Sequence, residues 1–272
     1  MPRDLNQLHT EATDQTLDAM PDLSSQSPTD QLHGEVRSAP MNVPERGPSE
    51  ASWGTMDSGT GPEGVKVYSK QLGLSDLESC CVLEDSSFPP EQRCSREKFE
   101  YRLTVAPELC HGLFTTSSEE YDAHHLVDAE TAKTSNLVET GGSRRQILIA
   151  HAIGTLSTNE TVLDEDMALP PGWREKAQKD PRLGHKADGR VACLHSLAVL
   201  PSYQNNRVGS TLLKHYIDIL RSSGNYDRLA LIADETHVGY YENRGFKNLG
   251  KSKASFGGVE WNGECSLVYE IR

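Results

Sequence analysis

Residues 191–213, VACLHSLAVLPSYQNNRVGSTLL, decide the fold of this chain. Their first ten residues are an apolar run rich in Val, Leu and Ala, which predicts a buried strand. Pro201 has no N–H to donate to a β-ladder and should end that strand. A polar turn follows, and from Arg207 onward apolar residues recur at helical spacing, at Val208, Leu212, Tyr216 and Ile219. The pattern is a strand, a tight turn and a helix N-terminus.

A helix N-terminus that follows a strand directly is a binding site for anions. Its first backbone N–H groups have no partner inside the helix, and the positive end of the helix dipole lies at the same place. A pyrophosphate group is the natural occupant of such a site.

The residues of this turn resemble a known loop. The run QNNRVGS at 204–210 is similar to the coenzyme-A pyrophosphate loop of the GCN5-related N-acetyltransferases (GNAT), Arg/Gln-x-x-Gly-x-Gly/Ala. Arg207 stands where the first glycine is usual, so this position must manage without the φ freedom of glycine. The flanking LHSLAV at 194–199 and YYENRGF at 240–246 resemble the arylalkylamine (serotonin) N-acetyltransferase group and its polyamine-acetylating relatives. The resemblance extends from about Glu78 to the C-terminus.

The resemblance implies an α/β fold with a mixed, mostly antiparallel sheet that is splayed at its centre and flanked by helices. We expect an N-acetyltransferase domain at residues 66–272, preceded by a disordered tail at residues 1–65. The tail has one aromatic residue, Trp53, and half of the chain's 14 prolines. Such a composition lacks the apolar residues for a core. The tail could recruit a regulatory partner, or it could serve solubility alone.

Composition restricts the partners and the compartment. The chain has 272 residues and a formal net charge of −13, which argues against nucleic acid or an anionic membrane and fits a cationic ligand or a solubilising acidic surface. Its six cysteines show no CxxC or zinc spacing, and the ten histidines show no HExxH, so we expect no metal. Without an apolar signal segment or a bilayer-length run, the sequence predicts a cytoplasmic protein with reduced thiols.

The remaining elements follow from the same patterns. Strands are expected at 78–83, 110–116, 146–156, 228–233 and 265–271, with the last closing the sheet and the vicinal Cys80 and Cys81 as strand filler. Phe88-Pro-Pro-Glu91 should begin a helical region, and Ser95 should cap a helix that Pro107 ends. A helix at 236–244 should be followed by a chain reversal at Gly245.

Two long polar connections interrupt this order. Residues 117–145 are long for a hairpin and read as a mobile insertion. Residues 159–190 contain the acidic run Asp164, Glu165 and Asp166. This run could attract a polyamine through its field, although a solvated loop is the favoured interpretation.

The resemblance assigns the cofactor-binding residues. Leu197, Ala198 and Val199 would offer backbone groups at a strand edge to the pantetheine arm of acetyl-CoA, by β-augmentation. The phosphates would bind at the loop and helix start, at Asn205, Asn206, Arg207, Val208, Gly209 and Ser210. The alternative is an ordinary buried strand and helix start.

His195 is the candidate general base. By two-residue alternation it should share a strand face with Cys193, Leu197 and Val199. An alkylamine is almost wholly protonated at neutral pH, so a base helps, and an imidazole suits this task. The related enzymes have two histidines here, at the positions of Cys193 and His195. This chain keeps the second alone, and a structural core histidine is the alternative.

The resemblance assigns two further site residues. Tyr241 aligns with the tyrosine that protonates the coenzyme-A sulfur in the related enzymes, and Tyr240 is its competitor for this role. Phe88 falls near an aromatic residue that lines the amine site, and is equally interpretable as a core residue.

The expected function is acetyl-CoA-dependent N-acetylation of a small primary amine, either an arylalkylamine or a polyamine. Transfer would be direct, within a ternary complex, because no nucleophile motif is present and nothing marks Cys193 as a reactive thiol. A protein lysine or N-terminal acetyltransferase, and a coenzyme-A-binding regulatory protein without catalysis, are the alternatives.

Overall fold

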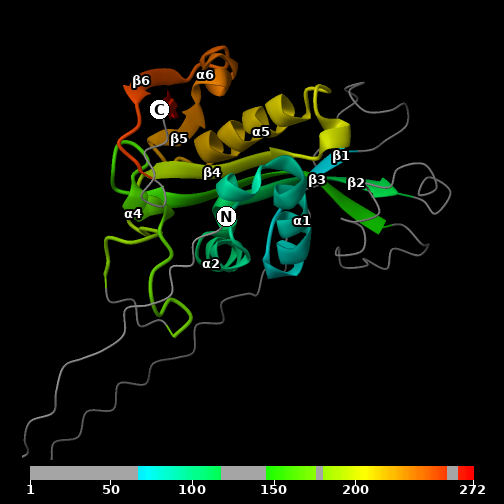
Figure 1. The fold of residues 1–272 in the computed structure, drawn as a ribbon, viewed down its shortest axis with the longest axis horizontal. Coiled ribbons are helices and arrows are strands. Elements are labelled where there is room, and N and C mark those ends of the chain that lie inside the picture. Colours follow the sequence, from blue (N-terminus) through cyan, green and yellow to red (C-terminus); the bar gives the residue numbers. More distant parts are fainter. Residues whose placement is uncertain (1–66, 118–144, 176–179, 256–262) are drawn as a thin grey trace, which may run out of the picture. The chain divides into compact units, whose positions relative to one another are not determined.

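In the computed structural model, residues 67–117, 145–175, 180–255 and 263–272 are described, and seven strands among them form one open sheet. The strand order is β1-β2-β3-β4-β5-β7-β6 (Figure 1). Every neighbouring pair is antiparallel except β4 and β5, which are parallel. The predicted fold class, a mixed and mostly antiparallel α/β sheet with flanking helices, is confirmed.

The elements have the following bounds. The strands are β1 (Val67–Gln71), β2 (Cys110–Ser117), β3 (Arg145–Ser157), β4 (Val191–Val199), β5 (Arg228–Asp234), β6 (Lys247–Lys251) and β7 (Glu264–Glu270). The α-helices are α1 (Leu77–Ser87), α2 (Arg96–Val105), α4 (Asp164–Met167), α5 (Val208–Ser223) and α6 (Glu235–Glu242). Short 3₁₀ turns lie at Leu74–Asp76, Pro90–Gln92, Pro107–Leu109 and Pro201–Tyr203.

Helices cover both faces of the sheet. On β3, the His151 ring lies against Phe99 of α2, with ring centroids 5.5 Å apart. The next residue, Ala152, pairs with His111 of β2, whose ring contacts Tyr216 of α5. Adjacent strand residues point to opposite faces. Therefore α1 and α2 lie on one side of the sheet and α5 lies on the other (Figure 1).

Helix α5 packs through a broad apolar face. Its buried residues are Val208, Leu212, Leu213, Tyr216, Ile217 and Leu220, whereas the predicted member Ile219 is only half-buried. The Tyr216 hydroxyl donates to the Leu109 carbonyl at 3.1 Å. A Cβ added at Gly154 would lie 2.6 Å from this hydroxyl, so the glycine permits the close approach of α5 to β3.

The prediction of a first strand at residues 78–83 is wrong, because these residues belong to helix α1. Leu77, Cys80 and Leu83 recur every three residues and are all buried on the helix face that packs on the sheet. This spacing is helical rather than alternating. Cys80 and Cys81 are consequently helix residues and not strand filler, and all six cysteines are free thiols.

The last predicted strand exists but does not close the sheet. β7 lies between β5 and β6, and β6 forms the edge. β1 at the other edge and β6 were both missed, because their five residues are half-buried or exposed and give no apolar period. The strands β2 to β5 were predicted to within two residues of their observed ends.

Other predicted features are confirmed. Ser95 caps α2, with its side chain accepting from the Lys98 N–H, and Pro107 begins the turn that follows the helix. Gly245 has a φ of 90° where the chain reverses after α6. The predicted insertion at 117–145 and the predicted tail at 1–65 fall almost wholly outside the described residues. Among the described residues, no helix is long and apolar enough to cross a membrane.

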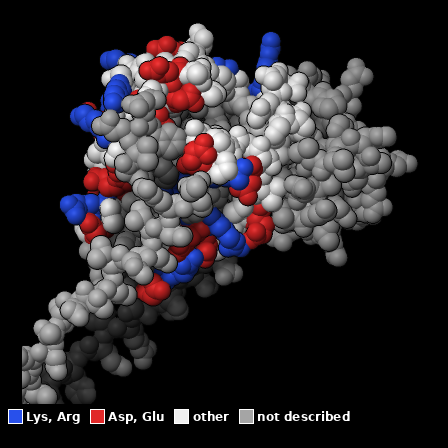
Figure 2. Space-filling model, in the orientation of Figure 1, with Lys and Arg blue, Asp and Glu red and all other residues white. Residues whose placement is uncertain are grey.

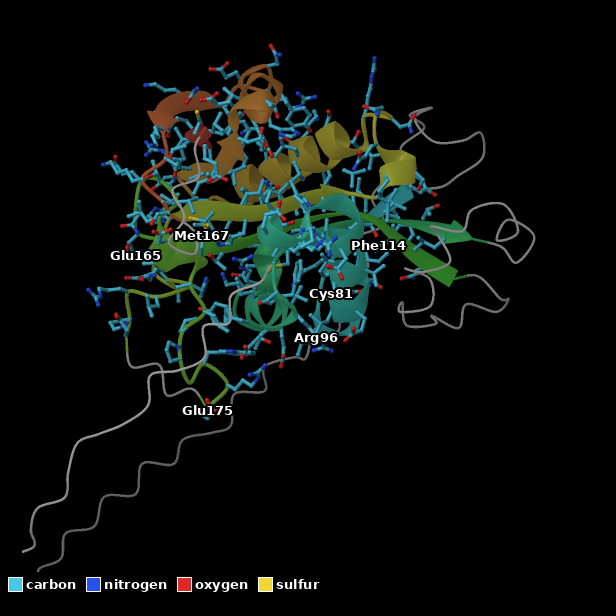
Figure 3. All side chains as sticks on the ribbon, in the orientation of Figure 1. Cys81, Arg96, Phe114, Glu165, Met167 and Glu175 are labelled. Atoms are coloured by element: carbon cyan, nitrogen blue, oxygen red, sulfur yellow. The ribbon has the colours of Figure 1, made fainter. Side chains whose placement is uncertain are left out.

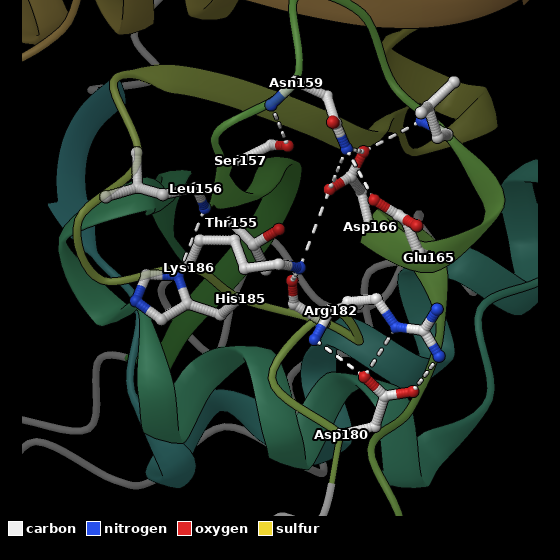
Figure 4. Close-up of polar contacts among 12 residues, drawn as sticks. Thr155, Leu156, Ser157, Asn159, Glu165, Asp166, Asp180, Arg182, His185 and Lys186 are labelled. Carbon is white, nitrogen blue, oxygen red and sulfur yellow. Dashed lines mark hydrogen bonds and ion pairs between the residues drawn. The ribbon is translucent and has the colours of Figure 1, made fainter.

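The acidic run in the connection between β3 and β4 lies in the short helix α4. The favoured interpretation of a solvated loop is wrong for Asp166, which is buried, whereas Asp164 is exposed. Asp166 is 1% exposed and accepts from the Leu163 N–H at 2.9 Å and from Asn159 Nδ2 at 3.2 Å, with Lys186 Nζ at 3.9 Å (Figure 4). Glu165 accepts from the same Asn159 amide at 2.9 Å. Asp164 accepts from the Ser255 N–H at 2.8 Å. These hydrogen bonds fasten the connection to the domain, and the buried Asp166 is not accessible to a ligand.

We expect deletion of Met1–Gly61 to leave both turnover and melting temperature unchanged. The segment has too few apolar residues to contribute to a core. The test is a comparison of the truncated and full chains by thermal unfolding and by an acetyl-transfer assay. A large loss in either measurement would show that the tail is part of the folded domain.

Candidate active site

Strands β4 and β5 separate halfway along their length. Their pairing ends at Leu194 and Leu231, while β4 stays paired with β3 as far as Val199. From His195 to Val199 no strand pairs with the edge of β4 that faces β5, although the Val199 carbonyl accepts from Ser87 Oγ at 3.1 Å and from Gln204 Nε2 at 3.0 Å. Unpaired N–H and C=O groups at such an edge can bind an extended ligand as an added strand.

A β-bulge lies where the strands separate. Ser196 pairs with Ile153 and Leu194 pairs with Gly154, so His195 is the extra residue. A bulge interrupts the alternation of side chains. Ser196 points toward Glu84 of α1, and Val199 Cγ2 lies beside Gly209 of α5 on the other side of the sheet. Because the bulge puts His195 on the same side as Ser196, the prediction that Leu197 and Val199 share the face of His195 is wrong.

The loop before α5 has the conformation that its resemblance implied. Arg207, in the position of the usual glycine, has a φ of 62°, and Asn205 has the same φ. The left-handed region costs an L-residue other than Asn or Asp roughly 1–2 kcal/mol. The Thr211 N–H donates to the Arg207 carbonyl at 2.9 Å, the first backbone hydrogen bond of the helix. The N–H groups of Val208, Gly209 and Ser210 therefore face outward from the first turn.

Gly209 sits in a narrow space beside this loop. A Cβ at this position would lie 3.3 Å from Val199 Cγ2 and 3.4 Å from the Tyr240 hydroxyl. Arg244, which the sequence analysis did not single out, stacks its guanidinium 3.5 Å from the centre of the Tyr240 ring and donates to Ser210 Oγ. A fixed cation thus lies next to the outward-facing N–H groups, as a phosphate site requires.

A cavity of about 810 Å³ joins this loop to the open edge of β4. Its walls come from α1, the turn after α1, α2, β4, β5 and α6. The candidate cofactor-binding residues line it, as do His195, Tyr241 and Phe88, with Asn206 the one exception. Phe88 is half-buried and also packs against the core, and its role at an amine site stays a prediction.

His195 is held by one hydrogen bond and keeps one nitrogen free. Its Nε2 lies 2.7 Å from Thr155 Oγ1, and its Nδ1 has no partner among the described residues. When Nε2–H donates to the threonine, Nδ1 presents a lone pair. Burial, together with the cations Arg102 and Lys98, lowers the pKa of His195 well below its usual value. The imidazole is therefore neutral at pH 7, and its buried Nδ1 is the atom that could accept a proton.

Tyr241 is suited to donate a proton. Its ring packs edge-on against Tyr240 and Phe246, with centroids 5.0 and 5.4 Å away. Tyr241 lines the cavity, and its hydroxyl makes no hydrogen bond with a described residue. Burial, then Tyr240 and Asp234, raises the pKa of the phenol well above its ordinary value. The group consequently remains protonated until a strong base such as a thiolate forms beside it.

A buried carboxylate that the sequence analysis missed lies at the cavity wall. Glu84 of α1 is 2% exposed and accepts from Ser196 Oγ at 2.7 Å and from the Cys94 N–H at 2.9 Å. His151 Nε2 lies 3.2 Å from the same carboxylate. Burial alone would raise the pKa of Glu84, but these hydrogen bonds outweigh it and lower the pKa. The carboxylate is therefore ionised at neutral pH.

Cys193, at the position of the first histidine in the related enzymes, has no acid–base role in this geometry. Its side chain is fully buried, and it packs in a small cluster with Val162, Ala230 and Val268. Burial, with Asp166 nearby, raises the pKa of the thiol well above its usual value. A thiol in this state is a poor nucleophile.

Charge on the visible face of the domain is mixed. Figure 2 shows acidic and basic side chains interspersed over the described part of that face, without a large area of one sign. Because charges of both signs alternate there, this face has no strong electrostatic potential of one sign, despite the negative net charge of the chain. Selection of a charged ligand falls to the groups that line the cavity.

A family model described as the Acetyltransferase (GNAT) family matches residues 144–246. The chain contains a GNAT domain. The match runs from the start of β3 to Phe246, so it contains the splayed strands, the loop before α5 and Tyr241. The loading GNATL domain of CurA from Lyngbya majuscula has the same fold, with a TM-score of 0.51 and 12% identity over 75% of this chain and 98% of that one.

Curated relatives cover part of the chain. Serotonin N-acetyltransferase of Mesocricetus auratus is 30% identical over 121 residues, 44% of this chain and 51% of the relative. The Homo sapiens protein of the same name is 28% identical over an alignment of the same length. The chain thus spans about half the length of the curated relatives that it matches.

The residues predicted from the sequence lie mainly on the β4 and α5 side of the cavity, and most of the opposite wall was not predicted. Glu84, Lys98 and Arg102 on that wall come from helices α1 and α2, and Arg244, beside the loop, follows α6. Glu84 was hidden by the incorrect strand, although Leu77, Cys80 and Leu83 at helical spacing would have revealed α1. No local signal marks the others, because their roles depend on what lies opposite them.

Proposed function

We propose that this protein transfers the acetyl group of acetyl-CoA to a small primary amine. The observation that supports this most directly is the open edge of β4 at 195–199, adjoining the first turn of α5 in one cavity with His195 and Tyr241. An extended thioester arm and its pyrophosphate need these two features together. The sequence resemblance indicates arylalkylamines and polyamines as the two amine classes.

The residues divide the chemistry as follows. Leu197, Ala198 and Val199 bind the pantetheine arm, and the residues from Asn205 to Ser210 bind the phosphates, with Arg244 as a further cation. The amine nitrogen attacks the thioester carbonyl after its proton passes to His195, directly or through water. The tetrahedral intermediate collapses with cleavage of the C–S bond, and the Tyr241 hydroxyl gives its proton to the departing sulfur. The buried Cys193 thiol favours this direct transfer over a covalent enzyme intermediate.

The decisive experiment is a panel of arylalkylamines, polyamines and lysine- or N-terminus-bearing peptides with acetyl-CoA, followed by release of free thiol. Turnover of the small amines supports the proposal. Exclusive turnover of peptides would assign the protein acetyltransferase alternative. Stabilisation by acetyl-CoA without thiol release for any acceptor would assign the non-catalytic coenzyme-A-binding alternative.

Gly209→Val should remove most of the rise in melting temperature that acetyl-CoA produces. A ligand at 100 times its Kd stabilises a folded protein by about 2.7 kcal/mol. The valine would occupy the space between Val199 and Tyr240 where the pyrophosphate has to approach the backbone. Gly239→Val is the matched control, because a Cβ at Gly239 meets nothing within 4 Å. An undiminished shift in Gly209→Val would show that the phosphates bind elsewhere.

A further inference from the structure

Helix α2 presents two cations to the cavity. Lys98 and Arg102 are one helical turn apart and both line it, facing His195. Arg102 is 5% exposed, so its guanidinium is among the most deeply buried charges of the domain. An arginine is charged at every physiological pH.

Arg102 has no anionic partner in the part of the chain that the structure describes. Among the described residues it makes no ion pair, and its guanidinium donates to the sulfur of Cys94 at 3.3 Å. Burial raises the pKa of the Cys94 thiol, so this sulfur is uncharged. The other arginine near this wall, Arg93, differs because it is paired with Asp85 and donates to the Phe88 carbonyl.

A buried charge without a counter-charge is costly. The desolvation penalty is several kcal/mol per ion and is normally offset by an ion pair with good geometry. Burial and then the Arg102 cation lower the pKa of Lys98, which shows that the two positive charges act on each other. None of the described residues supplies this counter-charge, and a bound anion could supply it.

The opposite charge in the cavity already has its partners. Glu84 accepts from Ser196 and from the Cys94 N–H, and it forms no ion pair with Arg102. The cavity wall therefore presents one negative group, Glu84 of α1, and one positive group, Arg102 of α2, to a bound molecule. A planar guanidinium matches a carboxylate through two parallel N–H···O bonds.

We infer that Arg102, with Lys98 beside it, binds a carboxylate group of a substrate at the acetyl-transfer site. This inference rests on the proposed function and narrows it. The ligand class is an amine that also carries a carboxylate, such as an amino acid, whose ammonium is drawn to Glu84 while its carboxylate meets Arg102. The same chemistry could enter on the acyl group of a dicarboxylic acyl-CoA, and the experiment separates the two sources.

The acceptor arm compares matched amines with acetyl-CoA: tryptamine against tryptophan, tyramine against tyrosine, and putrescine against 4-aminobutyrate. In the native protein the carboxylated member of each pair should have the lower KM. Arg102→Gln should raise that KM about tenfold, the usual scale for one hydrogen bond to a charged group. The KM of the uncarboxylated member should not rise. The donor arm compares succinyl-CoA with acetyl-CoA on the uncarboxylated amines, in the native protein and in Arg102→Gln.

Two variants control the experiment. Arg96→Gln removes another cation from the same helix (Arg96 is labelled in Figure 3). Arg96 is 58% exposed in its side chain and pairs with Glu78, and neither residue lines the cavity, so this variant should leave every KM unchanged. Arg102→Lys keeps the positive charge but loses the two-pronged geometry of the guanidinium. Its KM for the carboxylated amine should lie between those of the native protein and Arg102→Gln. The melting temperature of Arg102→Gln should not fall, because an uncompensated charge is removed.

The outcomes are distinct. Arg102-dependent selectivity for a carboxylate, in either arm, supports the inference and names its source. The inference is overturned if amines are acetylated equally well with and without a carboxylate and Arg102→Gln changes neither rate. A large fall in melting temperature in Arg102→Gln also overturns it. In both cases the proposed function stands. If no acceptor releases thiol, the proposed function fails. In that case stabilisation by tryptophan or tyrosine of the native protein but not of Arg102→Gln would still support the carboxylate site, and its absence would overturn it.

Discussion

His195→Ala should lower turnover on the order of 10²-fold at neutral pH, the scale for loss of a general base. The loss should shrink as the pH rises, because a growing fraction of the amine is then deprotonated without help. The lowered pKa of His195 means that the base is already neutral at pH 7. A decline of activity below pH 6.5 in the native protein would therefore have another origin. The measurement is a pH–rate profile for the native and variant proteins.

The same variant has a predicted effect on stability. The folded-state pKa of His195 is depressed, so below the unfolded value of about 6.5 the unfolded chain binds the extra proton first. The free energy of unfolding then falls as the pH drops through this window. His195→Ala removes this contribution, so its melting temperature should decline less between pH 7.5 and pH 5.5 than that of the native protein.

Two neighbouring variants decide whether the role of His195 is catalytic or structural. Thr155→Val removes the hydroxyl that lies 2.7 Å from His195 Nε2 but leaves the imidazole in place, so its loss of turnover should be smaller. His237 of α6 also lines the cavity, and His237→Ala should be mild. A pH-independent loss in His195→Ala with a matching loss of stability would mark a structural histidine. Severe damage in His237→Ala would transfer the base assignment to that residue.

Sequence patterns predicted the parts of this domain that depend on local chemistry. The run from Val191 to Val199 is apolar because β4 is buried, and Pro201 ended it as expected. Arg207 occupies a left-handed position that the loop pattern had identified. Each of these features is encoded within a few residues, where propensity and periodicity act.

Features that depend on partners distant in sequence were not predictable in this way. The bulge at His195 arises because β3 and β4 pair with one residue more on β4, and no single strand shows this. The burial of Asp166 depends on Asn159 and Lys186 at opposite ends of a long connection. Arg102 has no counter-charge among the described residues, and this depends on all the side chains that the fold places around it. Tertiary context decides such features, and local pattern does not contain them.

Tyr241→Phe should also lower turnover on the order of 10²-fold, while acetyl-CoA affinity stays nearly unchanged. The substitution keeps the ring and its contacts with Tyr240 and Phe246 and removes the hydroxyl alone. Because this hydroxyl makes no hydrogen bond with a described residue, its removal breaks no contact of the folded state there, and stability should be preserved.

The expected pattern for Tyr241→Phe is equal loss in kcat and kcat/KM, which marks an interaction made only in the transition state. Tyr240→Phe is the matched control on the adjacent residue. Its hydroxyl lies 3.4 Å from the Cβ position of Gly209, at the phosphate end of the cavity, so its removal should alter acetyl-CoA affinity slightly and kcat little. An acyl donor with a better leaving thiol should rescue Tyr241→Phe, because a less basic thiolate needs no proton to depart. If Tyr240→Phe is the more damaging change, or if the better leaving group gives no rescue, Tyr241 is not the group that protonates the sulfur.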